Sequence, residues 1–251
     1  MEKHLDRIMP KYRWGTIAPG EGGLQRGPQY QFYRIVPLDV MCVSIGLGIR
    51  DYTPELVEEA MPNFWRCVDR LVNEHVDHII IGGAPISAQL GHARVRGLID
   101  EVEKKTGLPG DAPIEAVIAG MHHLGLKKIA VASRWAPQLN NCIVGYLEDG
   151  GLECVGITER GHWYEVAHQM TLEEGIQATT DVSREAARID PNVEAVFVPG
   201  GATMTLHAIL QIEEEFGIPV FTNLNAEVWN GLIRPGIIDP VPDWGMLLAS
   251  K

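Results

Sequence analysis

The chain has 251 residues, of which 45% are hydrophobic and 22% are charged, as expected for a globular protein with one large domain or two smaller lobes. Its formal net charge is −12, and an acidic surface argues against nucleic acid or an anionic membrane as the main partner. A small anionic ligand stays open, because the field inside a site can differ from the net charge of the protein.

Short apolar runs alternate along the chain with longer amphipathic stretches, which is the pattern of parallel strands covered by helices. Two threonines are predicted to be N-cap residues of helices: Thr53, which precedes a proline and a glutamate, and Thr171, which begins a capping-box sequence. Pro62 predicts a helix break, and Gly125 and Gly217 predict helix ends. The predicted strands cover residues 15–18, 41–45, 78–82, 128–133, 154–157, 195–199 and 220–223.

The most informative feature is a repeat. An apolar strand and loop near Gly20 has a counterpart near Trp135, and each is followed later by a second strand that runs into a glycine pair. Gly83 follows Gly20 by 63 positions, and Gly201 follows Trp135 by 66. The repeat predicts an α/β protein of two pseudo-symmetric lobes with parallel sheets, each resembling half of a flavodoxin-like fold. We expect residues 1–120 and 224–251 in the first lobe and residues 121–223 in the second.

Ligands of open parallel sheets bind beyond the carboxyl ends of the strands. Glycine pairs at those ends, followed by helix N-termini, suit a carboxylate or phosphate, so we expect the site in the cleft between the lobes. No dinucleotide, P-loop, nucleophile-elbow or HExxH motif is present, and we expect neither a cofactor nor a metal. The predicted substrate-binding residues are Gly83, Ala84, Ser87, Arg134, Trp135, Gly200, Gly201, Thr203 and Asn223.

Together these features resemble the aspartate/glutamate-racemase superfamily, and within it the branch of arylmalonate decarboxylase, with maleate isomerase next. The resemblance covers nearly the whole chain. It implies a cofactor-independent lyase or isomerase that acts on a small carboxylate. Its marks lie at residues 17–19, 46–48, 53–55, 83–87, 106–109, 124–125, 130–140, 200–201, 205–206, 216–220 and 229.

The chain departs from that superfamily at its reactive positions. The resemblance implies two symmetry-related cysteines, or one cysteine and one glycine, at positions that here hold Gly83 or Ala84 and Pro199 or Gly200. The chain's own cysteines stand elsewhere and are expected to be small core residues. They are Cys42, Cys67, Cys142 and Cys154.

Histidine or acid chemistry is therefore expected in place of the thiol. The segment 159–168 follows a predicted strand and is rich in titratable side chains. His162 and His168 are the leading candidates, followed by Tyr164 and Glu165. Glu21, after the first strand, is a further candidate base. A capped helix with a polar exposed face is an equally good interpretation of that segment.

Two other functions stay open: a hydrolase of a small amide, ester or lactone, and a non-catalytic protein that binds a small anion. The expected partner is a small carboxylate, with no nucleic acid, no membrane and a possible homo-oligomer. The charged start of the chain, the absence of a long apolar run and the unpaired cysteines predict a cytoplasmic protein with reduced thiols.

Overall fold

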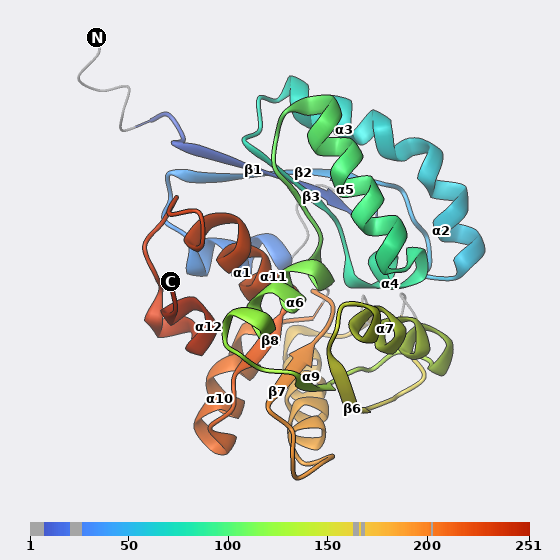
Figure 1. Cartoon of the computed structure of the whole chain (residues 1–251), viewed down its shortest axis with the longest axis vertical. Coiled ribbons are helices and arrows are strands. Elements are labelled where there is room, and N and C mark those ends of the chain that lie inside the picture. Colours follow the sequence, from blue (N-terminus) through green and yellow to red (C-terminus); the bar gives the residue numbers. More distant parts are fainter. Residues whose placement is uncertain (1–7, 21–26, 163–165, 167–168, 202) are drawn as a thin grey trace.

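Two parallel four-stranded sheets form the framework of the computed structural model, which describes residues 8–20, 27–162, 166, 169–201 and 203–251. The strand orders are β2-β1-β3-β4 and β6-β5-β7-β8, so the two lobes share one topology. Helices flank both sheets (Figure 1). This confirms the predicted α/β class with two pseudo-symmetric lobes. The strands are β1 (Tyr12–Ala18), β2 (Val40–Gly46), β3 (His78–Ile81), β4 (Gly110–Asp111), β5 (Lys128–Val131), β6 (Glu153–Ile157), β7 (Ala195–Val198) and β8 (Val220–Thr222).

Strands β3 and β7 are largely apolar because both faces of each sheet are covered by helices. Every residue of β3 and of β7 is buried, whereas most of the edge strand β2 is only partly buried. The sequence pattern did not predict β4, which has two residues and pairs in parallel with Ile79 and Ile80 of β3. A strand this short has no hydrophobic run or alternation that could reveal it.

Helix boundaries follow the expected capping chemistry. The Thr53 hydroxyl accepts a hydrogen bond from the Leu56 N–H, and Thr171 forms a complete capping box. Pro62 lies in the short helix that separates α2 from α3. None of the described helices is long and apolar enough to cross a membrane. The helices are α1 (Pro28–Ile35), α2 (Pro54–Ala60), η2 (Met61–Asn63), α3 (Phe64–Asn73), α4 (Ala84–Leu90), α5 (His92–Thr106), α6 (Pro113–His123), α7 (Pro137–Asp149), α9 (Leu172–Ala187), α10 (Leu206–Phe216), α11 (Asn223–Val228), η3 (Trp229–Ile233), η4 (Pro242–Trp244) and α12 (Met246–Ala249).

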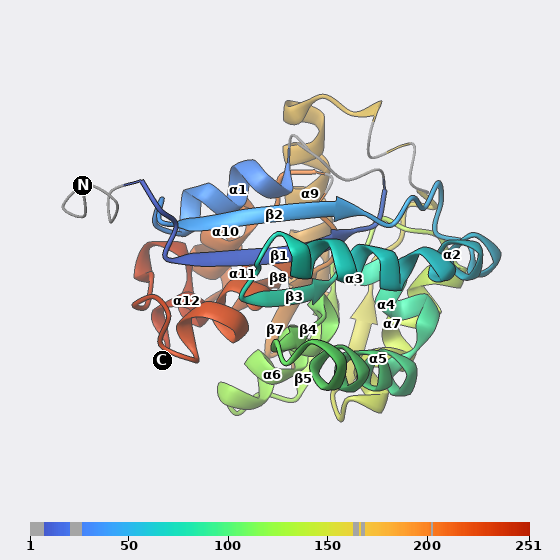
Figure 2. The same cartoon turned by 90° about the horizontal axis from the view of Figure 1, so that it is seen from above.

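The segment after β8 contacts both lobes. The centroid of the Trp229 ring lies 4.7 Å from that of His123 at the end of α6, and in the first lobe a Cβ on Gly231 would lie 2.6 Å from the Trp14 ring. In the second lobe, the Glu213 carboxylate of α10 accepts a hydrogen bond of 2.8 Å from the Met246 N–H. Figures 1 and 2 show this segment beside both α1 and α10. It therefore joins the lobes at the end away from β6.

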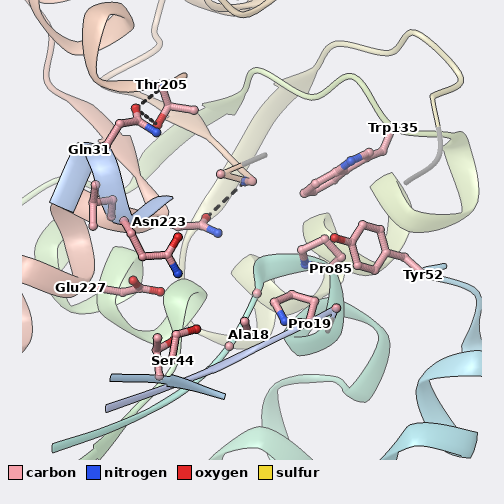
Figure 3. A pocket seen from close by; sticks show the side chains of 18 of the residues that line it. Ala18, Pro19, Gln31, Ser44, Tyr52, Pro85, Trp135, Thr205, Asn223 and Glu227 are labelled. Atoms are coloured by element: carbon pink, nitrogen blue, oxygen red, sulfur yellow. Dashed lines mark hydrogen bonds between the residues drawn. The ribbon is translucent and has the colours of Figure 1, made fainter. Parts of the chain in front are cut away.

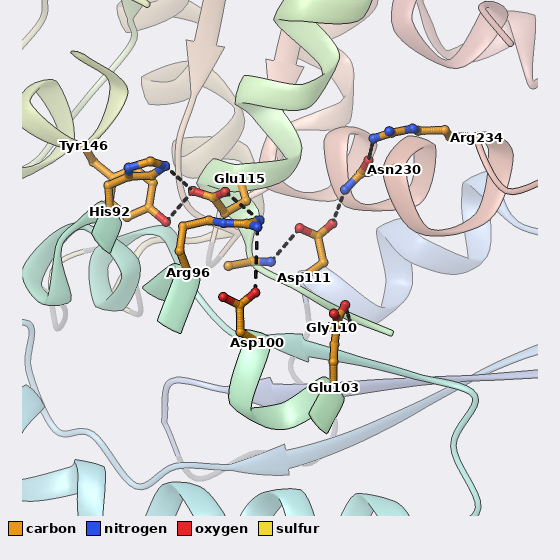
Figure 4. Close-up of polar contacts among 11 residues, drawn as sticks. His92, Arg96, Asp100, Glu103, Gly110, Asp111, Glu115, Tyr146, Asn230 and Arg234 are labelled. Atoms are coloured by element: carbon orange, nitrogen blue, oxygen red, sulfur yellow. Dashed lines mark hydrogen bonds and ion pairs between the residues drawn. The ribbon is translucent and has the colours of Figure 1, made fainter. Parts of the chain in front are cut away.

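A polar cluster lies where the lobes meet (Figure 4). Glu115 of α6 accepts a hydrogen bond of 2.8 Å from the Tyr146 hydroxyl of the second lobe and lies 3.3 Å from His92 Nε2. Asp111, at the end of β4, accepts a hydrogen bond of 2.7 Å from Asn230 Nδ2. Burial raises the pKa of Asp111 to about 7, although the Asn230 hydrogen bond acts in the opposite direction.

Candidate active site

A cavity opens between the lobes, at the carboxyl ends of the strands of both sheets (Figure 3). This is where parallel α/β sheets bind ligands. The first lobe supplies loops and strand residues from β1, β2 and β3, and the second lobe supplies loops after β5, β7 and β8. The described lining residues are Thr16, Ala18, Pro19, Gly20, Gln29, Gln31, Ser44, Tyr52, Gly82, Gly83, Pro85, Arg134, Trp135, Gly200, Gly201, Thr205, Asn223, Leu224 and Glu227.

Two glycine turns face this cavity from opposite lobes. Gly83 has φ +88°, and a Cβ there would lie 2.5 Å from Cγ of Pro19. Gly200 has φ +93°, and a Cβ there would lie 3.2 Å from the ring of Trp135. Both positions need glycine, for their backbone conformation and for the close approach of a neighbour. The turns thus bring unshielded backbone to the cavity wall, where N–H groups can bind an anion.

Arg134 follows β5 and is the cation of the lining. The residue is only 6% exposed, and its Nη1 atom has no hydrogen-bond partner among the described residues. Burial lowers the pKa of Arg134 to about 10, so the guanidinium stays charged at neutral pH. A buried cation with no ion-pair partner among the described residues is unfavourable, and an anionic ligand that enters the cavity relieves that cost. Guanidinium geometry favours a carboxylate.

Gln31 fixes one wall of the cavity by a hydrogen bond between lobes. Its Oε1 accepts from the Thr205 N–H at 2.7 Å and from the Leu206 N–H at 2.9 Å. These are the free N–H groups at the start of α10, which a helix cannot satisfy itself. The Gln31 side chain, on α1, therefore holds the N-terminus of α10 across the cleft (Figure 3).

Glu227 is the acidic residue among the described lining residues. It lies on α11, four residues after Asn223, so that both side chains share one face of the helix. Burial, and after it the negative charge of Asp111, raises the pKa of the Glu227 carboxyl well above its usual range. Sequence reasoning did not select Glu227. The available signal was its spacing of one helical turn from Asn223, which had been expected at the last strand's end.

The predicted binding residues divide into two groups. Ala84, Ser87 and Thr203 are buried and are not among the described residues that line the cavity. The Thr203 hydroxyl instead lies 3.2 Å from the Thr179 hydroxyl. The structure brings the others together around the cavity, namely Gly83, Arg134, Trp135, Gly200, Gly201 and Asn223.

Of the predicted proton carriers, His162 lies next to the cavity wall but is not among its described lining residues. The backbone N–H of His162 donates to the Arg134 carbonyl at 2.9 Å, and the backbone of His162 forms an isolated parallel bridge with Trp135. Burial and the positive charge of Arg134 lower the pKa of His162, so its ring is neutral at pH 7. Glu21, Tyr164, Glu165 and His168 lie outside the described residues.

The arylmalonate decarboxylase family profile matches residues 22–245 of this chain. The chain belongs to the arylmalonate decarboxylase family. Its sequence is 24% identical, over 239 residues, to the arylmalonate decarboxylase of Bordetella bronchiseptica, and the match covers 94% of this chain and 96% of the Bordetella enzyme.

Solved structures from this family and its relatives have the same fold. A double mutant of arylmalonate decarboxylase in its liganded form matches with a TM-score of 0.83 and 22% identity, over 94% of this chain and 98% of that chain. A cysteine mutant of Nocardia farcinica maleate cis-trans isomerase, with a covalently bound succinylcysteine intermediate, matches with a TM-score of 0.79 and 20% identity, over 95% and 98% of the two chains. These relatives are lyases and isomerases, and the protein is an enzyme of this group.

This member of the arylmalonate decarboxylase family has no cysteine in its cavity wall. All four cysteines are described, and none of them lines the cavity. Burial raises the pKa of each thiol, and that of Cys42 reaches about 12. No group of three or more histidine, cysteine, aspartate or glutamate residues in the described part of the chain could hold a metal ion. The reactive groups of the described cavity wall are therefore hydroxyls, a carboxyl and a guanidinium.

Proposed function

We propose that the protein is a cofactor-independent lyase or isomerase that acts on a small carboxylate by general acid–base chemistry. The observation that carries this proposal is the buried Arg134 guanidinium, which opens onto the inter-lobe cavity with no described hydrogen-bond partner at Nη1. One substrate carboxylate binds there, and the backbone N–H groups of Gly83 and Gly201, which both line the cavity, stabilise negative charge that develops during the reaction.

The charge pattern of the cavity supports a carboxylate substrate in an acidic protein. The net charge of the chain is −12, yet the described cavity wall contains one arginine and one carboxyl group whose raised pKa favours its neutral form. The local charge is thus positive. The apolar and aromatic surfaces of Pro19, Pro85 and Trp135 complete the wall and suit a substrate with a hydrophobic substituent.

Family membership supports the reaction class. The relatives named above decarboxylate arylmalonates or isomerise maleate, and both names describe chemistry at a carbon next to a carboxylate. The succinylcysteine found in the Nocardia isomerase requires a thiol. Because no thiol lines the cavity of this chain, we propose proton transfer by an acid or histidine side chain rather than a covalent cysteine intermediate.

The test is proton NMR of the purified protein in D₂O with phenylmalonate, maleate and phenylacetate as separate substrates. Loss of carbon dioxide, a maleate-to-fumarate change, or deuterium incorporation next to the carboxylate would support the proposal. A second panel of phenyl esters, amides and lactones tests hydrolysis. Turnover of that panel alone would replace the proposal with a hydrolase, and thermal stabilisation by these anions without any turnover would contradict it.

A further inference from the structure

Glu227 is placed so that its carboxyl group, and not only the backbone of its helix, reaches the cavity. The capping box formed by Thr222 and Asn225 fixes the start of α11 directly after β8. From that start, residues at positions 223, 224 and 227 face the cavity. Figure 3 shows the Asn223 amide and the Glu227 carboxyl pointing into the same hollow, with Ser44 close to Glu227.

The surroundings of this carboxyl group favour its protonated form. No hydrogen bond or ion pair joins the Glu227 carboxyl to another described residue, and the negative charge of Asp111 adds to burial in raising its pKa. Two hydroxyl groups lie side by side on the cavity floor, since Thr16 of β1 is in register with Ser44 of β2. The Ser44 hydroxyl is buried and has no hydrogen-bond partner among the described residues. Both hydroxyl groups are neutral and would not balance a negative charge on Glu227. The cation among the described lining residues is Arg134.

The Gly200 turn links the carboxyl group to the expected carboxylate site. The Gly200 N–H donates to Asn223 Oδ1 at 3.4 Å, and a Cβ on Gly200 would lie 4.0 Å from Arg134 Nη2. Asn223 therefore bonds to this turn and the Arg134 guanidinium lies close to it, and Glu227 lies one helical turn beyond Asn223. Arg134 and Glu227 line the same cavity, so a substrate carboxylate that binds Arg134 places its neighbouring carbon in the space that the Glu227 carboxyl also faces.

We infer that Glu227 is the catalytic acid that delivers a proton to the substrate carbon, an inference that rests on the proposed function. In a decarboxylation, the C–C bond to the departing carboxylate breaks, its electron pair stays on the α-carbon as an enediolate, and carbon dioxide leaves. The Glu227 O–H bond then breaks and its proton forms the new C–H bond. The resulting Glu227 carboxylate takes a proton from water, which restores the enzyme.

The decisive variant is Glu227→Gln, which keeps the size of the side chain and removes its acidic proton. With phenylmalonate we expect kcat to fall by about 10²–10⁴-fold, as for loss of a general acid, while KM and the thermal shift caused by phenylacetate change little. Cys42→Ala is the matched control, because Cys42 lies within electrostatic reach of Glu227 and outside the cavity wall. It should keep wild-type kcat.

Tyr52 is the competing donor, since its phenol also belongs to a cavity-lining residue. If Tyr52→Phe loses kcat and Glu227→Gln retains it, the role of Glu227 is overturned while the proposed function stands. If the wild type turns over none of the probes, the proposed function is overturned, and the state of Glu227 is tested separately.

A readout independent of turnover then decides the state of the Glu227 carboxyl. The infrared difference spectrum between wild type and Glu227→Gln at pH 7 should contain the carbonyl stretch of a protonated carboxylic acid. A carboxylate band in its place would overturn the inference.

Discussion

Replacing Arg134 by methionine should stabilise the folded protein and weaken ligand binding, two effects of opposite sign. The pKa of Arg134 is lowered from its ordinary 12.5 to about 10 because the side chain is buried. A shift of that size corresponds to about 3 kcal/mol against the charged form. The folded-state pKa is depressed, so the penalty is fully present below pH 10 and is relieved only as the pH rises toward 12.5. At pH 7 the whole penalty applies, and Arg134→Met removes it.

The size of each effect follows from the structure. For a chain of this length, about 3 kcal/mol corresponds to a rise in Tm of roughly 6–12 °C, and lost contacts of the arginine stem will reduce the rise to about 5 °C. Removing one partner of a buried charge pair costs about 2–5 kcal/mol in binding, which raises the Kd of a carboxylate ligand by about 30-fold to 4,000-fold.

Differential scanning calorimetry gives the Tm, and titration calorimetry with phenylmalonate gives the Kd. Arg160→Met is the matched control, because Arg160 forms an exposed ion pair with Glu185 and such pairs contribute little. A fall in Tm for Arg134→Met would mean that the guanidinium is a structural group. Unchanged affinity would mean that the substrate carboxylate binds elsewhere. Either result would refute the reasoning.

Three further predictions concern the glycine turn, the bridge between lobes and the pH profile. Gly83→Ala should lower stability by about 1–3 kcal/mol and turnover at least about tenfold in thermal unfolding and NMR assays, because the new Cβ meets Pro19 in a strained turn. Gln31→Ala leaves two buried N–H donors of α10 unpaired and should lower the free energy of unfolding in urea by about 2–4 kcal/mol, whereas Gln31→Glu, which keeps the acceptor, should lose less. The raised pKa of Asp111 means that the native state binds more protons than the unfolded state between pH 4 and pH 7, so stability should fall as pH rises through that range. Asp111→Asn should flatten this dependence of stability on pH. An unchanged pH dependence in that variant would contradict the assignment to Asp111.

The fold was predictable because its signals are local. The fully buried strands β3 and β7 appear in the sequence as apolar runs that end in glycine pairs, and the repeat of that pattern gives the two lobes. The starts of two helices were predictable from Thr53 and Thr171, whose hydroxyls accept hydrogen bonds from backbone N–H groups in the first turn. The two-residue strand β4 was not predictable, because only its pairing with β3 defines it.

The cavity wall was predictable where a residue lies at or just beyond a strand end, as Asn223 does directly after β8 and Arg134 does shortly after β5. It was not predictable where two lobes must first come together. Gln31 accepts a hydrogen bond from Thr205, which lies 174 positions further along the chain. No local sequence pattern predicts a contact between residues so far apart. Glu227 stands in an ordinary helical stretch, and its chemistry arises from burial beside Asp111. The titratable segment around His162 was selected by composition, which does not say which side of a wall a side chain occupies.

The position of α11 in the chain has a consequence for biosynthesis. Residues 223–251 contact both lobes and supply Asn223 and Glu227 to the cavity, yet the ribosome makes them after every strand of both sheets. Domains generally fold as units while the chain emerges, in N-terminal to C-terminal order. Both lobes can therefore fold on the nascent chain before the enzyme has a complete active site. Catalytic competence would then be acquired only when this segment docks against lobes that are already formed.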